Sequence, residues 1–447
     1  METMKQTGIQ WIGEIPTDWN TKRIKYMANL KGRIGWQGLT SDEYQDDGAY
    51  LITGVDFADG GIDWENCVHV PMKRWEEAKD IQIQNGDLLI TKDGTIGKVA
   101  IVSDMPGETS LNSGVLRIMP IEGYSRRFLY WVIKSDEFWN WFNFRNAGNS
   151  TIIHLYQGDF AEFLYAFPNY EEQEAIADFL DEHCGKLDGI IADLEKQIKT
   201  LKAYKKSLIT ETVTKGLNKN APMKDSGISW IGKIPKHWDV KRLKYMLEDS
   251  NDNMRVGPFG SALSTADYSE TGYWVYTQRT VLDDNFTSND TYIDESKYKE
   301  LIGFSVKSGD VLITTRGTIG KVAIVPEEHF TGVLHPCIIR FRMNPKMLSH
   351  ELLKIIFNDS DFISKQFVYM SNATTIDVIY SYSLKDIVLP VIPLDEQNEI
   401  IQFLLTQCGI IDETLIDKQT QLAKMQSHRS SLIFEYVTGK KRVKEVQ

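Results

Sequence analysis

The sequence predicts an α+β protein with two similar mixed α/β domains and two long helices, arranged as an internal repeat with pseudo-two-fold symmetry. Three observations predict this fold. Several stretches of the 447-residue chain recur in the same order. Short β-like runs alternate with turn residues in two separate segments. A heptad pattern of apolar residues follows each of these segments. Self-similarity in a fixed order indicates a duplicated architecture.

The repeat is visible letter by letter. TGIQWIGEIPTDWNTKRIKYM, which starts at Thr7, returns as SGISWIGKIPKHWDVKRLKYM from Ser226. GTIGKVAIV occurs without change from Gly94 and from Gly317. EEQEAIADFLDEHCGKLD, which starts at Glu171, returns as DEQNEIIQFLLTQCGIID. Two copies of one unit suggest two copies of one task.

These patterns divide the chain into four segments, with mixed domains at 1–169 and 217–393 and long helices at 170–216 and 394–447. In each mixed domain we expect short strands followed by a helix. Apolar and aromatic residues at helical spacing predict that helix over Ser125–Phe144 in the first domain and from Leu348 to about Met370 in the second.

Heptad spacing predicts that each long helix has a coiled-coil partner. If the two helices pair with each other, the pseudo-two-fold repeat makes them antiparallel. In the first helix, leucines recur every seven residues, at Leu180, Leu187, Leu194, Leu201 and Leu208. In the second helix, apolar residues occupy two equivalent rows, at Leu404, Ile411 and Met425 and at Leu415 and Leu422. Lys418 and Arg429 interrupt these rows, which predicts a weaker seam. Asn169 and Glu172 have the spacing of an N-terminal cap, and Gly216 suits a helix end.

Composition limits the functional classes. The net charge of −12 and the pI near 5.3 argue against a protein that binds nucleic acid over its whole surface. We therefore expect the isolated chain to bind DNA weakly. No stretch reaches the roughly 20 apolar residues that span a bilayer, and the start of the chain lacks a secretory signal. The four cysteines are far apart, so we expect a cytoplasmic protein without disulfides or a zinc site.

No complete catalytic set is found in the sequence. Gly94–Lys98 is too short for a phosphate-binding P-loop and continues with Val99 instead of Ser or Thr. The same residues suit a β-hairpin turn between two apolar strands. The eight histidines show no metal-binding spacing. We therefore predict no catalytic residues, no metal site and no catalysis by this chain.

The repeated opening, the GTIGKVAIV strings and the EEQ- or DEQ-started helices together resemble the specificity subunit of type I restriction-modification systems. The resemblance covers essentially the whole chain, in order and in duplicate. It implies that 1–169 and 217–393 are target-recognition domains, each reading one half of a split sequence in double-stranded DNA. It also implies that the helices fix the spacer between the half-sites and dock two methyltransferase subunits, with restriction and motor subunits as further partners.

The resemblance also implies where the cofactors are bound. S-adenosylmethionine, ATP and Mg²⁺ would belong to the partner subunits, and this chain would bind no cofactor. The alternatives are an orphan or decoy specificity protein and a two-headed scaffold for a partner other than DNA.

Candidate DNA contacts are basic and polar residues on repeated turns and glycine-containing loops. In the first domain they are Arg33, Trp36, Gln37, Lys92, Thr95, Lys98, Asn149, Ser150 and Thr151. In the second domain they are Phe259, Ser261, Arg316, Thr318, Lys321, Thr374 and Thr375.

Two repeated basic clusters leave two interpretations open, because they suit either phosphate contact or a salt-bridged domain surface. The clusters are Lys22, Arg23 and Lys25 and their counterparts Lys241, Arg242 and Lys244.

The two domains differ most between Ala28–Gln84 and Leu247–Lys307, which share almost no local sequence. Shared parts would supply the scaffold and the docking surfaces, while divergent parts would supply sequence readout. The sequence therefore predicts an asymmetric target with two different half-sites and an unread spacer.

Overall fold

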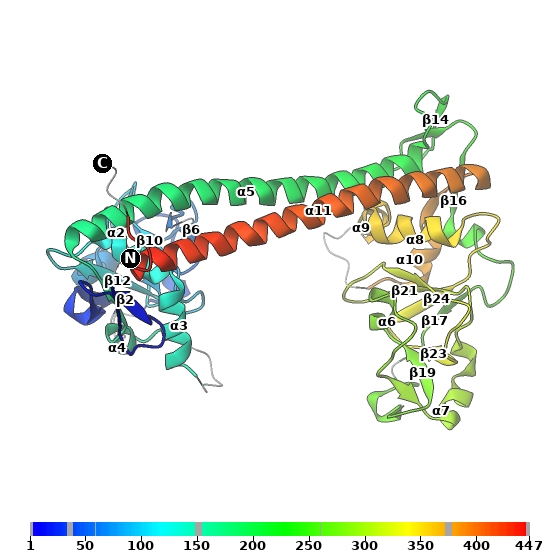
Figure 1. Ribbon diagram of the computed structural model, residues 1–447. Coiled ribbons are helices and arrows are strands. Elements are labelled where there is room, and N and C mark those ends of the chain that lie inside the picture. The colour runs from blue at the N-terminus through cyan, green and yellow to red at the C-terminus, as the bar shows by residue number, and fades with distance from the viewer. Residues whose placement is uncertain are drawn as a thin grey trace. The chain divides into compact units, whose positions relative to one another are not determined.

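The computed structural model describes residues 3–33, 39–58, 60–147, 154–259, 261–371 and 378–443 (Figure 1). The chain divides into two compact units, and each is described by itself. Unit 1 comprises 1–195 with 420–447, and unit 2 comprises 196–419. No helix among the described residues is long and apolar enough to cross a membrane.

In the described part of unit 1, a four-stranded antiparallel sheet and a three-stranded sheet form the centre of the domain. The four-stranded sheet has the order β10 (Val99–Ile101), β9 (Leu88–Thr91), β12 (Val115–Pro120), β4 (Ala28–Gly32). The three-stranded sheet has the order β11 (Thr109–Leu111), β5 (Ala49–Ile52), β8 (Val68–Val70), with β11 and β5 parallel. Three two-stranded pairs complete the strands, and they are β1 (Met4–Gln6) with β2 (Glu14–Pro16), β3 (Asn20–Arg23) with β13 (Leu164–Phe167), and β6 (Phe57–Ala58) with β7 (Gly61–Ile62).

The described part of unit 2 repeats this plan. Its first sheet has the order β17 (Met254–Val256), β24 (Ile338–Phe341), β21 (Val311–Thr314), β22 (Val322–Ile324). Its second sheet has the order β18 (Tyr268–Ser269), β20 (Tyr292–Ile293), β19 (Tyr273–Tyr276), β23 (Gly332–Leu334), with β19 and β23 parallel. The strand pairs are β14 (Met223–Asp225) with β15 (Lys233–Pro235), and β16 (Asp239–Arg242) with β25 (Val388–Val391). The prediction of two similar mixed domains is confirmed.

Short helices pack against the sheets of each domain. Those of unit 1 are α1 (Met72–Glu76), α2 (Arg126–Lys134), α3 (Asp136–Arg145) and α4 (Gln157–Ala161). Those of unit 2 are α6 (Gln278–Leu282), α7 (Glu295–Glu300), α8 (His350–Asp359), α9 (Phe362–Ser371) and α10 (Ser381–Asp386).

The sequence predicted one helix over the stretch of α2 and α3 and one over that of α8 and α9, but the structure has two helices in each. The prediction missed the break at one serine in each domain. Ser135 ends α2 and starts α3, because its hydroxyl oxygen accepts from the Glu137 amide at 3.2 Å. Ser360 separates α8 from α9 in the same way, accepting from the Phe362 amide at 3.2 Å. A serine cap competes with the helix interior for backbone donors.

Two long helices, α5 (Tyr170–Lys215) and α11 (Leu394–Val437), each contribute residues to both units. The predicted cap is present, because the Glu172 amide donates to Asn169 Oδ1 at 2.9 Å. Gly216 follows the end of α5 with a φ of 72°. In unit 1 the start of α5 and the end of α11 share one apolar cluster, which includes Cys184 and Ile433. In unit 2 the end of α5 and the start of α11 share another. The helices therefore run antiparallel within each unit.

The predicted seam residues are all buried or half-buried. The buried ones are Leu180, Leu194, Leu404, Ile411 and Leu415, and the half-buried ones are Leu187, Leu201, Leu208, Leu422 and Met425. Burial along one row of each helix is what a seam between paired helices requires.

One of the two charged interruptions in the seam, Arg429, belongs to a repeated pair of ion pairs. In unit 1, Arg429 Nε lies 2.5 Å from Asp188 Oδ1 and Arg429 Nη2 lies 3.1 Å from Asp188 Oδ2. In unit 2, Lys205 Nζ lies 2.7 Å from Asp412 Oδ2. Arg429 follows Lys205 by 224 residues, and Asp412 follows Asp188 by the same 224. The two ion pairs are therefore equivalent positions of the repeat, with the cation on opposite helices. Arg429 joins the two helices in unit 1 where the sequence alone predicted a weaker seam.

A buried tryptophan joins the first domain to the helices. Trp19 donates from its indole nitrogen to Glu172 Oε2 at 2.9 Å, near the start of α5. Gly439, just beyond the end of α11, packs on the same ring so closely that a Cβ there would lie 3.0 Å from Trp19 Cζ3. One side chain of the domain thus contacts both helices of unit 1.

Unit 2 repeats this junction with the roles of the helices exchanged. Trp238 donates to Glu396 Oε2 at 3.0 Å, near the start of α11. Gly216, just beyond the end of α5, packs on the Trp238 ring, where a Cβ would lie 3.2 Å away. The tryptophan contacts between domain and helices are therefore repeated in the two units.

Glu137 gives unit 1 a stability that depends on pH. Its side chain is completely buried, and Oε1 accepts from the Ala166 amide at 3.0 Å. Burial raises the pKa of Glu137 from its ordinary value of 4.5 to about 8, although the Ala166 bond and the charge of Lys440 act in the opposite direction. Between these pH values the folded chain keeps a proton that the unfolded chain releases, so stability falls as the pH rises.

Glu137→Gln should remove this dependence, because the amide oxygen keeps the bond to Ala166 without a charge. Near pH 5 the two proteins should unfold at similar urea concentrations. Toward pH 8 the variant should gain roughly 1.4 kcal/mol per pH unit over the wild type. Urea denaturation at four pH values measures this, with the exposed Glu122→Gln as a control. Parallel pH profiles for all three proteins would contradict the assignment.

The two seam ion pairs should differ in strength. We expect a coupling energy of about 0.5 kcal/mol for the partly exposed Lys205–Asp412 pair, and about twice that for Arg429–Asp188, because two parallel bonds fix the guanidinium. Double-mutant cycles with Lys205→Ala and Asp412→Ala, and with Arg429→Ala and Asp188→Ala, measure both. Zero coupling at Arg429–Asp188 would show that this pair does not stabilise the helix pairing.

Candidate nucleic-acid interface

The repeated GTIGKVAIV strings lie in β-hairpins, as predicted. The first hairpin joins β9 to β10, and the second joins β21 to β22, both antiparallel. In the first, the Thr91 amide donates to the Lys98 carbonyl and the Gly97 amide donates to the Thr91 carbonyl, both at 2.9 Å. The second hairpin repeats both bonds at 2.9 Å, between Thr314, Lys321 and Gly320.

The glycines of these turns are required by the backbone and by close packing. Gly94 and Gly97 have φ values of 68° and 79°, and their counterparts in the second hairpin have 63° and 78°. A Cβ at Gly97 would lie 2.7 Å from the Trp139 ring. Because only glycine adopts this region without a steric cost, the sequence fixes the shape of both tips.

The tip side chains differ in how they are held. Thr95 is exposed, and its hydroxyl donates to the Gly54 carbonyl at 3.0 Å. Lys98 is exposed and Lys92 half-buried in the first tip. In the second, Arg316 and Thr318 are exposed, whereas Lys321 Nζ donates to the Asn358 carbonyl. Lys321 is thus tied to α8, and Arg316 is the exposed cation at that tip.

The loop that follows the parallel strand lies beside the hairpin in both domains. In the first domain this loop contains Gly54, which accepts from Thr95. In the second domain β19 is followed by Thr277 and then by helix α6, and a Cβ at Gly317 would lie 3.4 Å from Nε2 of Gln278, the first residue of α6. These loops fall in the segments where the domains diverge. Each domain therefore places a variable loop against a shared hairpin.

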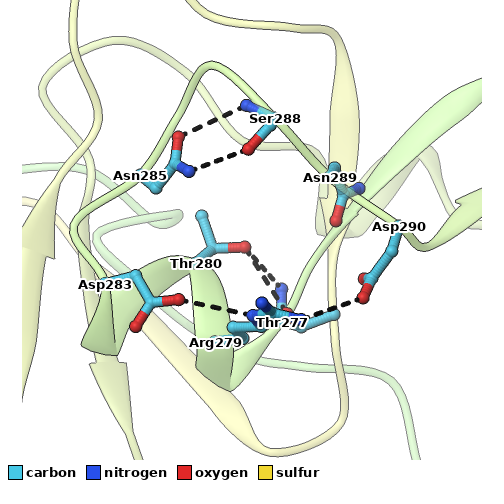
Figure 2. Close-up of a pocket in the computed structure, with 8 residues that line it drawn as sticks. All are labelled: Thr277, Arg279, Thr280, Asp283, Asn285, Ser288, Asn289 and Asp290. Carbon is cyan, nitrogen blue, oxygen red and sulfur yellow. Dashed lines mark hydrogen bonds and ion pairs between the residues drawn. The ribbon is translucent and has the colours of Figure 1, made fainter.

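In the second domain, helix α6 and the loop that follows it line a polar cavity of about 200 Å³ (Figure 2). Arg279 reaches toward both Asp283 and Asp290, at 3.3 and 3.4 Å, while the Asn285 amide bonds to Ser288. The side chains that line the cavity are all polar, and they are Thr277, Arg279, Thr280, Asp283, Asn285, Ser288, Asn289 and Asp290. Donors and acceptors close together suit the hydrogen-bonding edges of bases.

Arg33 is placed differently from the other predicted contacts. It is buried, with 6% of its surface exposed, and its Nε donates to the Leu111 carbonyl at 2.7 Å. Its Nη2 lies 3.2 Å from Ser110 Oγ, and burial lowers its pKa to about 10. The side chain thus holds β11 from inside the domain, where it is not available to a duplex.

The remaining predicted contacts divide into two groups. Phe259 and Ser261 are exposed, with 82% of Phe259 accessible. The others lie outside the described residues and stay predictions, namely Trp36, Gln37, Asn149, Ser150, Thr151, Thr374 and Thr375.

The repeated basic clusters form salt-bridged surfaces, the second of the two interpretations that the sequence left open. In the first domain, Arg23 Nε lies 3.1 Å from Glu162 Oε2, and Lys25 pairs with the same carboxylate. The equivalent acid in the second domain, Asp386, pairs with Arg242 at 3.2 Å and with Lys244 at 3.3 Å. One carboxylate neutralises part of each cluster, which weakens its attraction for phosphate.

Two side chains near the first tip were missed by the sequence reasoning. His154 Nδ1 lies 2.6 Å from Asp93 Oδ1, and both side chains are about two-fifths exposed. Aligning the two hairpins could have pointed to Asp93, because the equivalent residue in the second hairpin is Arg316. Within the described residues, no group of three or more His, Cys, Asp or Glu side chains could hold a metal ion.

Comparison with known proteins identifies the family. The sequence pattern of the type I restriction modification DNA specificity domain matches residues 16–200 and 235–418. The chain is similar to the type I restriction enzyme MjaIX specificity subunit of Methanocaldococcus jannaschii, with 26% identity over 97% of this chain and 96% of that protein. It is also similar to the EcoBI specificity subunit of Escherichia coli, with 22% identity over 97% and 88%.

A solved structure supports the same fold. It comes from a study of complex assembly and conformational transition of the type I R-M system, and it covers 96% of this chain and 99% of its own, with a TM-score of 0.68 and 14% identity. The two matched regions correspond to the two halves of the repeat. The chain therefore belongs to the type I restriction modification DNA specificity family, and it is a specificity subunit with two DNA specificity domains.

Proposed function

We propose that each domain reads one half of an asymmetric bipartite DNA target through its hairpin tip and the adjoining variable loop. The observation that carries this proposal is the pairing of a shared hairpin frame with a divergent loop in each copy. A shared frame positions both domains on a duplex in the same way, and different loops select different bases. The family favours this function over a scaffold for a partner other than DNA.

Charge supports contact at the tips. Within the described part of the chain, Lys92, Lys98 and Arg316 form no ion pair, unlike the clusters held by Glu162 and Asp386. Unpaired cations next to a turn can neutralise phosphates or donate to guanine. The tips are therefore better placed to bind a duplex than the larger basic clusters.

The long helices suit a role in spacing and assembly. A helix of 46 residues, such as α5, is roughly 70 Å long. Its predicted partner in a coiled coil is α11, whose heptads keep the same register after 224 residues. We infer that the pair fixes the unread spacer and docks two methyltransferase subunits, one for each half of the repeat.

The chain would contribute recognition and leave the chemistry to its partners. S-adenosylmethionine, ATP and Mg²⁺ would bind to the methyltransferase and motor subunits. The net charge of −12 supports this division, because an acidic chain gains little phosphate affinity by itself. Tight binding would then require cationic surfaces from the assembled complex.

The methylation pattern of a host tests this function. Long-read methylome sequencing with and without this chain, in the presence of its methyltransferase partner, should reveal one motif with two different half-sites and a fixed unread spacer. The half-sites should differ because the two variable loops differ. A palindromic motif, or a continuous one, would contradict the proposal.

Lengthening both helices should lengthen the spacer. One heptad inserted after Glu195 and one after Gln419, which are equivalent positions, preserves the apolar register of both helices. Seven residues add about 10 Å, so the spacer should grow by roughly three base pairs at about 3.4 Å each. Both half-sites should stay the same. An unchanged spacer, or new half-sites, in the methylome of an assembled variant would refute the spacing role.

A further inference from the structure

The two hairpin tips share their strand pairing and the left-handed conformation of their glycines, but they carry opposite charges at one position. Besides the bonds between their strands, both tips bind the residues just before a short helix, which is α4 in the first domain and α10 in the second. The Leu155 amide donates to the Lys92 carbonyl at 3.0 Å, and the Ile379 amide donates to the Thr315 carbonyl at 2.9 Å. On this common frame, the residue before the first tip glycine is Asp93 in one domain and Arg316 in the other.

The residue that faces this position changes together with it. His154 faces Asp93, and its Nδ1 lies 2.6 Å from the carboxylate. The equivalent residue in the second domain is Val378, 224 residues later, which pairs with Arg316 through the backbone. A valine side chain offers no hydrogen bond, and Arg316 forms no ion pair within the described residues. The acid is therefore held by a partner, and the arginine stays free to bind.

The Asp93–His154 pair is not needed to build the turn. The second hairpin keeps the two bonds between its strands and similar positive φ values at its glycines without any such pair, although a Thr95 amide bond to the Asp93 carbonyl is found in the first tip alone among the described residues. Both side chains of the pair are partly exposed, at 41% and 39%. The equivalent turn in the second domain forms with Arg316 and Val378. Folding of the turn therefore does not explain why the first domain has Asp93 and His154 at these positions.

The two tips differ in the base edges that they can bind. An aspartate accepts hydrogen bonds and repels phosphate, so on DNA it suits the amino group of cytosine in the major groove. Lys92 and Lys98 on the same hairpin can neutralise the flanking phosphates. An arginine donates two bonds to O6 and N7 of guanine. We propose that this matched position determines specificity, with Asp93 accepting from an exocyclic amino group in one half-site and Arg316 donating to guanine in the other.

His154 would act as a positioning residue for Asp93. Its bond to Oδ1 leaves Oδ2 free to accept from a base. Because the ring is not required for folding of the equivalent turn, His154→Gln should keep assembly and DNA binding. It should weaken only the discrimination at the base that Asp93 contacts, which a merely structural role would not do.

The inference rests on the proposed function, so the wild-type motif is determined first. The variant Arg316→Asp with Val378→His gives the second tip the side chains of the first at these two positions. In the complex with its methyltransferase subunits, methylome sequencing should show one guanine of one half-site replaced by a base with a major-groove amino group. In binding assays, discrimination at that position should change by about 10- to 100-fold, while the other half-site stays the same.

Two further variants keep the test decisive. Arg316→Gln neutralises the charge with a smaller change, and it should shift the preference from guanine to adenine. Lys98→Gln is the matched control at a tip position that both repeats share, and it should weaken binding to all sequences alike without changing the motif.

Each alternative result has a distinct meaning. An unchanged motif in assembled Arg316 variants, with affinity lowered equally for all sequences, would show a phosphate contact and overturn the proposal. An unchanged motif with unchanged affinity would also overturn it. A wild type without a bipartite motif would instead contradict the proposed function itself.

Discussion

The fold depends on one junction that occurs once in each half of the chain. Trp19 and Trp238 are buried, and each donates its indole N–H to a glutamate in the first turn of one long helix. The glycine that follows the other long helix packs on the same ring. Each domain is therefore fixed to the start of one helix and to the end of the other. That arrangement requires the helices to be antiparallel within each unit, and the equivalent ion pairs Asp188–Arg429 and Lys205–Asp412 agree with it.

Some features of the chain recur in both halves of the repeat, and others differ between them. The junctions, the hairpin backbones and the salt-bridged clusters recur in both halves. The loops after β5 and β19 do not, and neither does the charge at Asp93 and Arg316. Under the proposed function, the shared parts would dock the methyltransferase subunits and the different parts would read the two half-sites. The acidic net charge is compatible with this function because few phosphate contacts are needed from a chain that acts within a complex.

The sequence predicted the repeat, the long helices and the hairpins, because these features follow from periodicity and from matching text. The sequence-based predictions failed where the local structure depends on the contacts of a single side chain. Ser135 and Ser360 each break an apolar helical pattern by capping a new helix, and Arg429, an apparent interruption, forms an ion pair with a residue 241 positions away. Arg33 resembled a DNA contact in a polar loop, but its burial depends on carbonyl and hydroxyl partners in β11. The Asp93–His154 pair joins residues 61 positions apart, which no local pattern reveals.

The most direct measurement is site-specific cross-linking between the hairpin tips and the DNA. Thr95 and Thr318 are equivalent and exposed, so Thr95→Cys and Thr318→Cys can each be paired with duplexes that carry a thiol-tethered base at successive positions of the target. In the assembled complex, Thr95→Cys should cross-link only within one half-site and Thr318→Cys only within the other, with neither reacting in the spacer. Cross-links from both cysteines within the same half-site, or from neither cysteine, would contradict the account.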